Sequence, residues 1–431
     1  MKKLLDKVRK SSLVKNVAIL ASGTAMAQVV NVAAAPILTR LFDPSEFGVL
    51  AIIISIAGVL AAIACLKYDM AIVLAKKDSD AAGIFLLCGC VVLVVSLSVG
   101  CFMYLYGDWV AALMKSPEAG DLMFLIPVML FFGGSAQAAI SWNTRRKWFK
   151  WQSFSKVTTS FTTAAAQIGF GLASFSGAGL LFGRLIGESI GSMLQSFAVV
   201  KNDFAMIFCR DAVSRMGAQA REHKDFPRFT APRALLVNLS NNFVPMFLGI
   251  LFGPAAAGSY WLTHRLVWMP TTLLGQAVQR VFYQQATEIH HDGKSIAPLL
   301  IQSTWWMMAI GAIPSLLLML LAPPAFILLF GENWGQAGLF AQWMALWWFT
   351  TFAAVPSNSG IFILGLQQYF LFFEAFGVVL RGLALYVGSQ VGDAVMAIAF
   401  FSATTMLLNF YRIYYVIRRA KAATTDAVPA E

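Results

Sequence analysis

Residues 80–104 read DAAGIFLLCGCVVLVVSLSVGCFMY and carry no charged side chain after Asp80. A helix needs ~20 mainly apolar residues to cross the hydrocarbon core of a bilayer, so this stretch is long enough for one crossing. Similar runs recur along the 431-residue chain, which is 58% hydrophobic and only 12% charged. A soluble protein carries about 25% charged residues, and so few charges would not cover a soluble surface. The sequence therefore predicts an all-α membrane protein, since the alternation typical of barrel strands is absent.

Apolar segments of this kind predict about twelve transmembrane helices. Several begin with a proline in the first turn, as at Pro44 and Pro254, where proline suits a helix start. The segment at 254–283 exceeds what a bilayer needs and predicts a helix that tilts or protrudes into the cytoplasm. The segments lie at 14–38, 44–66, 80–104, 121–142, 154–175, 178–200, 233–252, 254–283, 297–321, 337–363, 367–389 and 392–416.

The positions of Lys and Arg predict the orientation in the membrane. With a cytoplasmic N-terminus, all of the 32 Lys and Arg residues except five fall in cytoplasmic loops or ends. Arg40 and Lys115 fall outside, and Arg184, Arg265 and Arg381 lie inside apolar segments. Because Lys and Arg accumulate on the cytoplasmic side, both termini are predicted to be cytoplasmic. The same rule explains the net charge of +11, so no nucleic-acid partner is expected.

The two halves of the chain resemble each other at an offset of 210 residues. LFDP at 41–44, followed by Gly48, corresponds to LFGP at 251–254, followed by Gly258. Six helices return the chain to the side on which it started, so the halves would be parallel repeats, as in several transporters. We predict a central cavity for substrate between two six-helix lobes. The expected parts are an N-terminal lobe at 1–200, a cytoplasmic linker at 201–232, a C-terminal lobe at 233–416 and a cytoplasmic tail at 417–431.

The basic residues of the predicted linker allow two interpretations. They either set the topology of a plain connection, which we favour, or bind anionic lipid headgroups of the membrane. The linker residues concerned are Arg210, Arg215, Arg221, Lys224 and Arg228.

No motif for catalysis, ATP hydrolysis or metal binding occurs in the chain. A phosphate-binding loop and the HExxH pattern are both missing, so we expect neither an enzyme nor a bound cofactor. The five cysteines have no metal-site or disulfide spacing, and His290-His291 is interpreted as a solvated pair. No metal is therefore expected.

Ionisable residues inside the apolar segments are the candidates for function. A charge in mid-bilayer costs at least ~2.5–3.5 kcal/mol, so such residues usually face a cavity or a partner. Arg265 lies eleven residues after Pro254, which places it ~16 Å along its helix, near mid-depth. Arg184 and Glu188 share a helix face at the i,i+4 spacing and are expected to neutralise each other in part. Glu374 and Arg381 are two turns apart, ~10 Å along the axis, which we judge too far for direct pairing.

These residues divide into three predicted roles. Arg265, Arg381 and Arg184 are candidates for binding an anionic substrate, because arginine stays protonated and grips phosphate bidentately. Glu188 and Glu374 are candidates for coupling to an ion gradient, of protons or sodium. Asn31, Asn241 and Asn242 offer amides either to a sugar or to neighbouring helices.

Three stretches resemble the Wzx-type polysaccharide flippases of the multidrug/oligosaccharidyl-lipid/polysaccharide exporter superfamily. They are VAILASGTAMAQ at 17–28, PILTRLFDPSEFG at 36–48 and LKYDMAIVL at 66–74. The resemblance implies two six-helix lobes around a central, cationic cavity. It also implies that an undecaprenyl-pyrophosphate-linked oligosaccharide moves from the inner to the outer leaflet by alternating access. Partners would be the lipid-linked oligosaccharide, membrane lipids and other polysaccharide-assembly proteins.

Three alternatives remain open. A drug or small-molecule exporter of the same superfamily would favour acids in its cavity, whereas arginines outnumber acids here. A membrane-embedded glycan polymerase or ligase would need a sizeable outer loop with charged catalytic residues, and the predicted outer loops are short. A scaffold without transport activity has little need for charge in mid-membrane.

Overall fold

The structure is a computed structural model that describes residues 2–425. Every regular element in this part of the chain is a helix, and eight helices are long and apolar enough to cross a membrane. The predicted class, an all-α multi-pass membrane protein, is confirmed. The other four predicted segments also contain helices, namely α6, α7, α10 and α13, so the fold is consistent with twelve crossings.

The described chain divides into two compact units, unit 1 up to Gly258 and unit 2 from Ser259 onward. The helices up to the end of unit 1 are α1 Lys2–Leu41, α2 Pro44–Ala61, α3 Tyr68–Leu74, α4 Asp78–Leu113, η1 Pro117–Leu122, α5 Leu125–Arg145, α6 Phe149–Leu172, α7 Gly177–Ile207, α8 Arg210–Glu222, η2 Phe226–Thr230 and α9 Ala231–Phe252. Those that follow are α10 Pro254–Pro270, η3 Thr271–Gly275, α11 Gln276–His291, α12 Ala297–Phe330, η4 Glu332–Trp334, α13 Gly335–Ala353, α14 Val355–Ile363, α15 Gln367–Val391 and α16 Ala394–Thr425.

The boundary between these units is not the boundary expected between the lobes. The helix α9 packs against α2 and belongs to unit 1, while the region 201–232 is mostly helical, as the end of α7, then α8 and η2. The lobes at 1–200 and 233–416, the linker and the tail stay predictions. Residues 417–425 continue α16, and residues 426–431 of the predicted tail lie outside the described residues.

Prolines account for two breaks that the hydropathy pattern did not predict. The segment at 254–283 ends its first helix at Pro270, and a π-helical turn leads into α11. The segment at 337–363 is interrupted after Ala353, and Pro356 occupies the first turn of the next helix. Proline lacks the N–H of a helical hydrogen bond and clashes with the preceding turn, so it kinks or breaks a helix.

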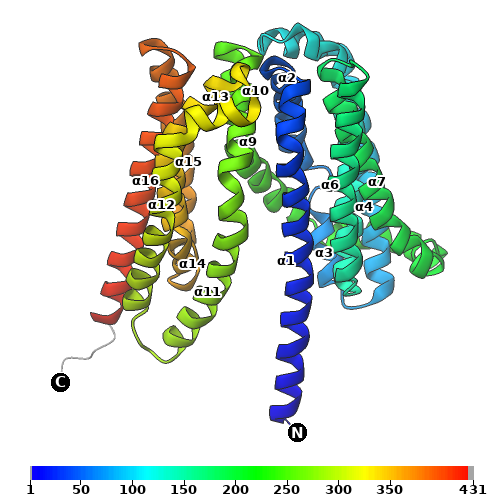
Figure 1. Cartoon of the computed structure of the whole chain (residues 1–431). Helices are drawn as coiled ribbons and strands as arrows, with labels where there is room; N and C mark the ends of the chain where they lie inside the picture. The colour runs from blue at the N-terminus through cyan, green and yellow to red at the C-terminus, as the bar shows by residue number, and fades with distance from the viewer. Residues whose placement is uncertain (1, 426–431) are drawn as a thin grey trace. The chain divides into compact units, whose positions relative to one another are not determined.

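Small residues allow the helices of unit 1 to approach closely. The helix α7 carries Gly183, Gly187 and Gly191 at four-residue spacing, and all three are buried or half-buried against α6. A Cβ on Gly187 would lie 1.9 Å from the hydroxyl of Thr163, so no larger residue fits there. Such contacts are typical of helix packing in membranes, where backbones must come close for dispersion forces to act. The long helix α1 packs along α6 in the same way (Figure 1).

Hydrogen bonds between helices hold unit 2 together. The hydroxyl of Thr263 on α10 donates to the carbonyl of Ala337 on α13 over 2.9 Å. The amide of Asn409 on α16 donates to the hydroxyls of Thr350 and Thr351 on α13, at 3.2 and 2.9 Å. Figure 1 shows α16 beside α15, and the two helices pack together. These buried polar contacts set the positions of the helices that carry the charged residues described next.

Candidate functional site

Two arginines and a glutamate form a charged cluster inside unit 2. Arg381 and Glu374 of α15 form an ion pair over 3.3 Å, and Arg412 of α16 binds the other carboxylate oxygen of Glu374. Arg412 also donates to the amide oxygen of Asn358 on α14 over 3.2 Å. The side chains of Arg381 and Arg412 are only 12% and 11% exposed, whereas that of Glu374 is 43% exposed. Two guanidinium groups share one carboxylate, so the cluster carries one excess positive charge.

The pairing of Glu374 with Arg381 corrects the sequence-based expectation that they lie too far apart. That estimate considered the rise of the backbone and neglected the reach of two long side chains. The sequence analysis also counted Arg412 among the cytoplasmic charges, although it lies within the apolar segment 392–416. Its place in that segment, one turn after Asn409, was the signal that could have identified it. The Nε atoms of both arginines are buried and have no hydrogen-bond partner in the described part of the chain.

Arg184 and Glu188 behave as their spacing predicts. They form an ion pair on α7 with 2.8 Å between the guanidinium nitrogen and the carboxylate oxygen. Their side chains are 32% and 26% exposed. Each neutralises the other, so this pair has no excess charge to offer to an anion.

Arg265 lies in an aromatic environment on α10. Its guanidinium carbon is 5.1 Å from the ring centroid of Trp261, a cation–π contact. The preceding residue, His264, belongs to a stacked aromatic column that the sequence analysis missed. Its ring centroid lies 5.7 Å from that of Tyr260 and 5.6 Å from those of Trp268 and Trp347. The spacing of Tyr260, His264 and Trp268 at i,i+4 was the available signal, since such residues share a helix face.

The candidate asparagines lie on two helices of unit 1. Asn31 is half-buried on α1, and Asn241 is exposed on α9. The side-chain amide of Asn242 donates to the carbonyl of Asn238 within α9 and lies beside Gly58 of α2. For Asn242 the contact therefore agrees with the interhelical interpretation.

The three candidate arginines lie on three different helices, each with its own neighbours. Arg184 is on α7 of unit 1, while Arg265 and Arg381 are on α10 and α15 of unit 2. Of the predicted site residues, the structure brings into ion pairs Arg184 with Glu188 and Glu374 with Arg381.

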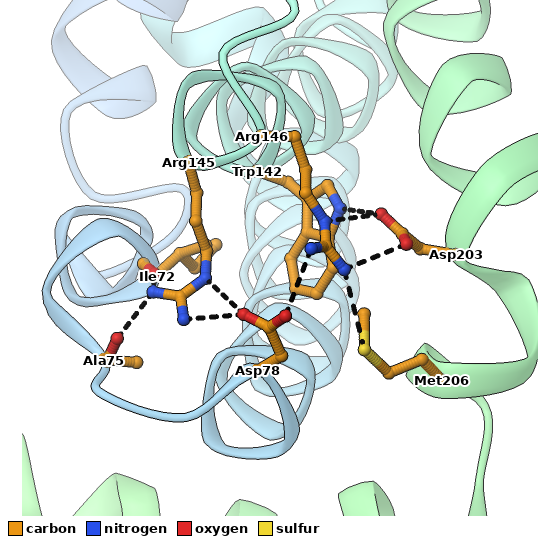
Figure 2. A network of polar contacts seen from close by, with 8 residues as sticks. All are labelled: Ile72, Ala75, Asp78, Trp142, Arg145, Arg146, Asp203 and Met206. Carbon is orange, nitrogen blue, oxygen red and sulfur yellow. Dashed lines mark hydrogen bonds and ion pairs between the residues drawn. The ribbon is translucent and has the colours of Figure 1, made fainter.

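A second charge network joins the ends of α4, α5 and α7 in unit 1 (Figure 2). Arg146 binds both carboxylate oxygens of Asp203 over 2.9 Å and reaches Asp78 over 3.1 Å. The indole N–H of Trp142 donates to Asp203 over 2.9 Å. Arg145 binds Asp78 over 2.8 Å and the backbone carbonyls of Ile72 and Ala75. Two arginines face two aspartates, so the network is balanced in charge and fixes the three helix ends together.

The helix α8 is attached next to this network. Arg215 donates to Asp80 at the start of α4 over 2.8 Å and to Asp211 within α8 over 3.1 Å. These hydrogen bonds, led by the one to Asp80, raise the pKa of the Arg215 guanidinium above its ordinary value. Ala212 is buried in the apolar core formed with α3, α4, α5 and α7. The predicted linker is thus in part a helix anchored to unit 1.

Similarity to known proteins extends over most of the chain. Residues 37–338 match the family described as "Polysaccharide biosynthesis protein". The succinoglycan biosynthesis transport protein ExoT of Rhizobium meliloti (strain 1021) is 23% identical over 312 residues, which cover 70% of this chain and 59% of that protein. The chain thus spans less than two thirds of that relative's length.

Solved structures show the fold. An inward-facing multidrug resistance MATE family transporter of the MOP superfamily matches with a TM-score of 0.73 and 14% identity, over 93% of this chain and 96% of that one. The lipid II flippase MurJ, in an inward closed conformation, matches with a TM-score of 0.71 and 11% identity, over 95% and 90% of the two chains. The chain has the fold that these transporters share.

Proposed function

The chain belongs to the family of polysaccharide biosynthesis proteins, and from this membership we propose that it is a transporter rather than an enzyme. It flips an undecaprenyl-pyrophosphate-linked oligosaccharide from the inner to the outer leaflet by alternating access. The product serves the synthesis of a surface polysaccharide, which is an O-antigen, a capsule or an exopolysaccharide. The family match carries this proposal, and the fold shared with a lipid II flippase supports it.

The membrane concerned is the bacterial cytoplasmic membrane, with both termini on the cytoplasmic side. The distribution of Lys and Arg along the sequence supports this orientation. Other polysaccharide-assembly proteins and membrane lipids are the further partners.

Fixed arginines meet the main physical difficulty of this transport. A pyrophosphate group must cross ~30 Å of hydrocarbon, where an unpaired charge is very costly. Arg381 lies with Arg412 in a cluster that carries one excess positive charge, so it can attract an anion while it stays in contact with Glu374. Arg265 presents its guanidinium beside Trp261, which suits a sugar-phosphate because aromatic rings also stack on sugars. Arg184 contributes less, because Glu188 occupies it.

Energy coupling is assigned to Glu374 and Glu188. Protonation of Glu374 would remove the negative charge that holds Arg381 and Arg412, and two guanidinium groups would become available to the substrate. Loss of the proton would restore the ion pairs and weaken the grip on the phosphate. Glu188 has the equivalent relation to Arg184. A proton gradient would in this way be linked to substrate binding and release, and sodium binding to the carboxylate would act similarly.

Depletion of the protein in its native host tests the function. We expect a lipid-linked oligosaccharide to accumulate in the inner leaflet, measured by its resistance to a glycan-modifying reagent added outside intact cells. A drug exporter would instead alter drug susceptibility without this accumulation. A normal distribution of all lipid-linked glycans after depletion would refute the proposal.

A further inference from the structure

A cavity of about 530 Å³ lies within unit 1 at one end of the helices. It lies between α1, the turn that joins α5 to α6, and α7. Two lysines, two tryptophans and two asparagines contribute to its wall: Lys147, Lys150, Trp148, Trp151, Asn16 and Asn202. This combination of cations, amides and large aromatic rings in one hollow is unlike the balanced network of Figure 2.

The backbone of the turn holds Lys147 in a conformation that glycine favours. The N–H of Trp148 donates to the carbonyl of Asn143 over 2.8 Å, and that of Lys147 donates to Thr144 over 3.0 Å. These two bonds form a Schellman motif at the end of α5, and the residue at its turning point adopts a left-handed conformation. Lys147 has φ of 60° there, which costs free energy for any residue with a Cβ. The motif thus fixes the backbone position of Lys147 at the wall of the cavity.

The rings beside the cavity connect it to an exposed apolar surface. The indole N–H of Trp151 donates to the carbonyl of Leu194 over 2.6 Å, which fixes the ring against α7. The ring lies 5.7 Å from Phe154 and 6.2 Å from Phe197, centroid to centroid. Phe154 and Phe197 are 55% and 53% exposed, as suits side chains that face lipid. Tryptophan and lysine together are typical of the level of the lipid headgroups.

The charge at the cavity is positive. None of the described residues that line it is acidic. Asp203 follows Asn202 along α7, but its carboxylate is bound by Arg146 and Trp142. Among the described residues of the cavity wall, Lys147 and Lys150 have no carboxylate opposite them, and an anion there would find two ammonium groups.

We propose that this cavity binds the phosphate headgroup of a membrane lipid. Lys147 and Lys150 contact the phosphate, the amides of Asn16 and Asn202 bind headgroup hydroxyls, and the hydrocarbon chain lies along Phe154 and Phe197. The ligand is defined by a phosphate on a lipid chain, which a glycerophospholipid and an isoprenyl pyrophosphate both provide. In the predicted topology the site lies at the cytoplasmic leaflet. The proposed lipid site does not depend on the proposed transport activity, because lipid binding is measured separately from flipping.

Native mass spectrometry of the full chain tests this site. The probes are phosphatidylglycerol, undecaprenyl pyrophosphate, diacylglycerol as a neutral lipid, and inorganic phosphate. We expect at least one phosphate-bearing lipid to bind, and the double variant Lys147→Gly/Lys150→Gln to weaken that binding about a hundredfold, since each of the two charge-assisted hydrogen bonds is worth roughly tenfold in affinity. Glycine at 147 relieves the backbone strain, so the variant is expected to fold, which its thermal unfolding temperature checks.

The control removes two lysines elsewhere with the same change in charge. Lys76 and Lys77 are exposed in the connection between α3 and α4, and Lys76→Gln/Lys77→Gln should bind lipid as the wild type does. The lipid that loses affinity identifies the source of the phosphate. If inorganic phosphate binds and none of the phosphate-bearing lipids does, the site takes free phosphate, which contradicts a lipid site. An equal loss of lipid affinity in both double variants, or no loss of affinity in either, would overturn the proposal.

Discussion

Gly48 and Gly258 each lie against the other's helix start, in a reciprocal contact. A Cβ on Gly48 would lie 1.8 Å from the carbonyl oxygen of Pro254, and a Cβ on Gly258 would lie 2.0 Å from that of Pro44. Each glycine follows its proline by four residues, and the two sets are 210 residues apart, as in the repeat found in the sequence. The first turns of α2 and α10 therefore touch through equivalent residues. This reciprocity gives the faint sequence repeat a structural counterpart.

Alanine at either glycine should destabilise the protein. Because the nearest atoms belong to backbone, they cannot rotate away, and overpacking of this kind costs typically 1–3 kcal/mol. Thermal unfolding of purified Gly48→Ala and Gly258→Ala would show lower midpoints than the wild type. Gly89→Ala on α4 is the control, because its Cβ would meet open space. A midpoint for either variant as high as that of Gly89→Ala would contradict the contact.

Replacement of Arg265 tests substrate binding. Arg265→Ala should fold and insert but lose flipping, so lipid-linked glycan builds up on the inner leaflet. Arg265→Lys should restore only part of the activity, because it keeps the charge and loses the bidentate fork. Arg233→Ala, at an exposed site near the start of α9, should flip normally. Flipping by Arg265→Ala at the wild-type rate and protein level would show that this arginine is structural.

Energy coupling can be tested at the two membrane glutamates. Glu374→Gln and Glu188→Gln keep the shape of the side chain but cannot exchange a proton. At least one of them should abolish the dependence of flipping on the ion gradient while the protein level stays normal. Flipping would be measured in vesicles with and without an imposed gradient. If flipping by both single variants depends on the ion gradient as it does in the wild type, the coupling hypothesis is wrong.

Loss of Asp203 should loosen one end of unit 1. Its carboxylate accepts from Arg146 and Trp142, and both side chains are largely buried, at 26% exposure for Arg146 and 0% for Trp142. Asp203→Ala would leave these donors without that acceptor, which costs roughly 1–3 kcal/mol. The thermal midpoint should fall, whereas Asp292→Ala should leave it nearly unchanged. In the described part of the chain Asp292 forms an ion pair with Lys294, and both are mostly exposed, where ion pairs contribute little. Equal effects of the two substitutions would argue against the network.

Cysteine labelling tests the topology, and the structure guides the choice of the outer site. Cys209 should resist an impermeant thiol reagent added outside intact cells and react after permeabilisation, since the region 201–232 is predicted to be cytoplasmic. The outer position must be exposed, and Ser116 is unsuitable because it is only 2% exposed. Glu118 in the same loop is exposed, so Glu118→Cys should label from outside. Labelling of Cys209 in intact cells would mean an inverted topology or a wrong helix count.

The sequence alone determined the features that depend on local pattern. The length and apolar character of each run predicted the membrane-spanning helices, because a helix must bury its backbone within a ~30 Å layer whatever its neighbours are. The pairing of Arg184 with Glu188 followed from spacing within one helix, where geometry is set by 3.6 residues per turn.

Only the tertiary structure decided which distant residues meet. Arg412 joins Glu374 and Arg381 because α15 and α16 pack together, and no spacing along the chain encodes that contact. The same holds for Arg146 with Asp203, and for the cavity at Lys147, which needs α1 beside the turn between α5 and α6. Hydropathy records how much of a helix is apolar, whereas these contacts depend on the direction of each helix face and on the reach of its side chains.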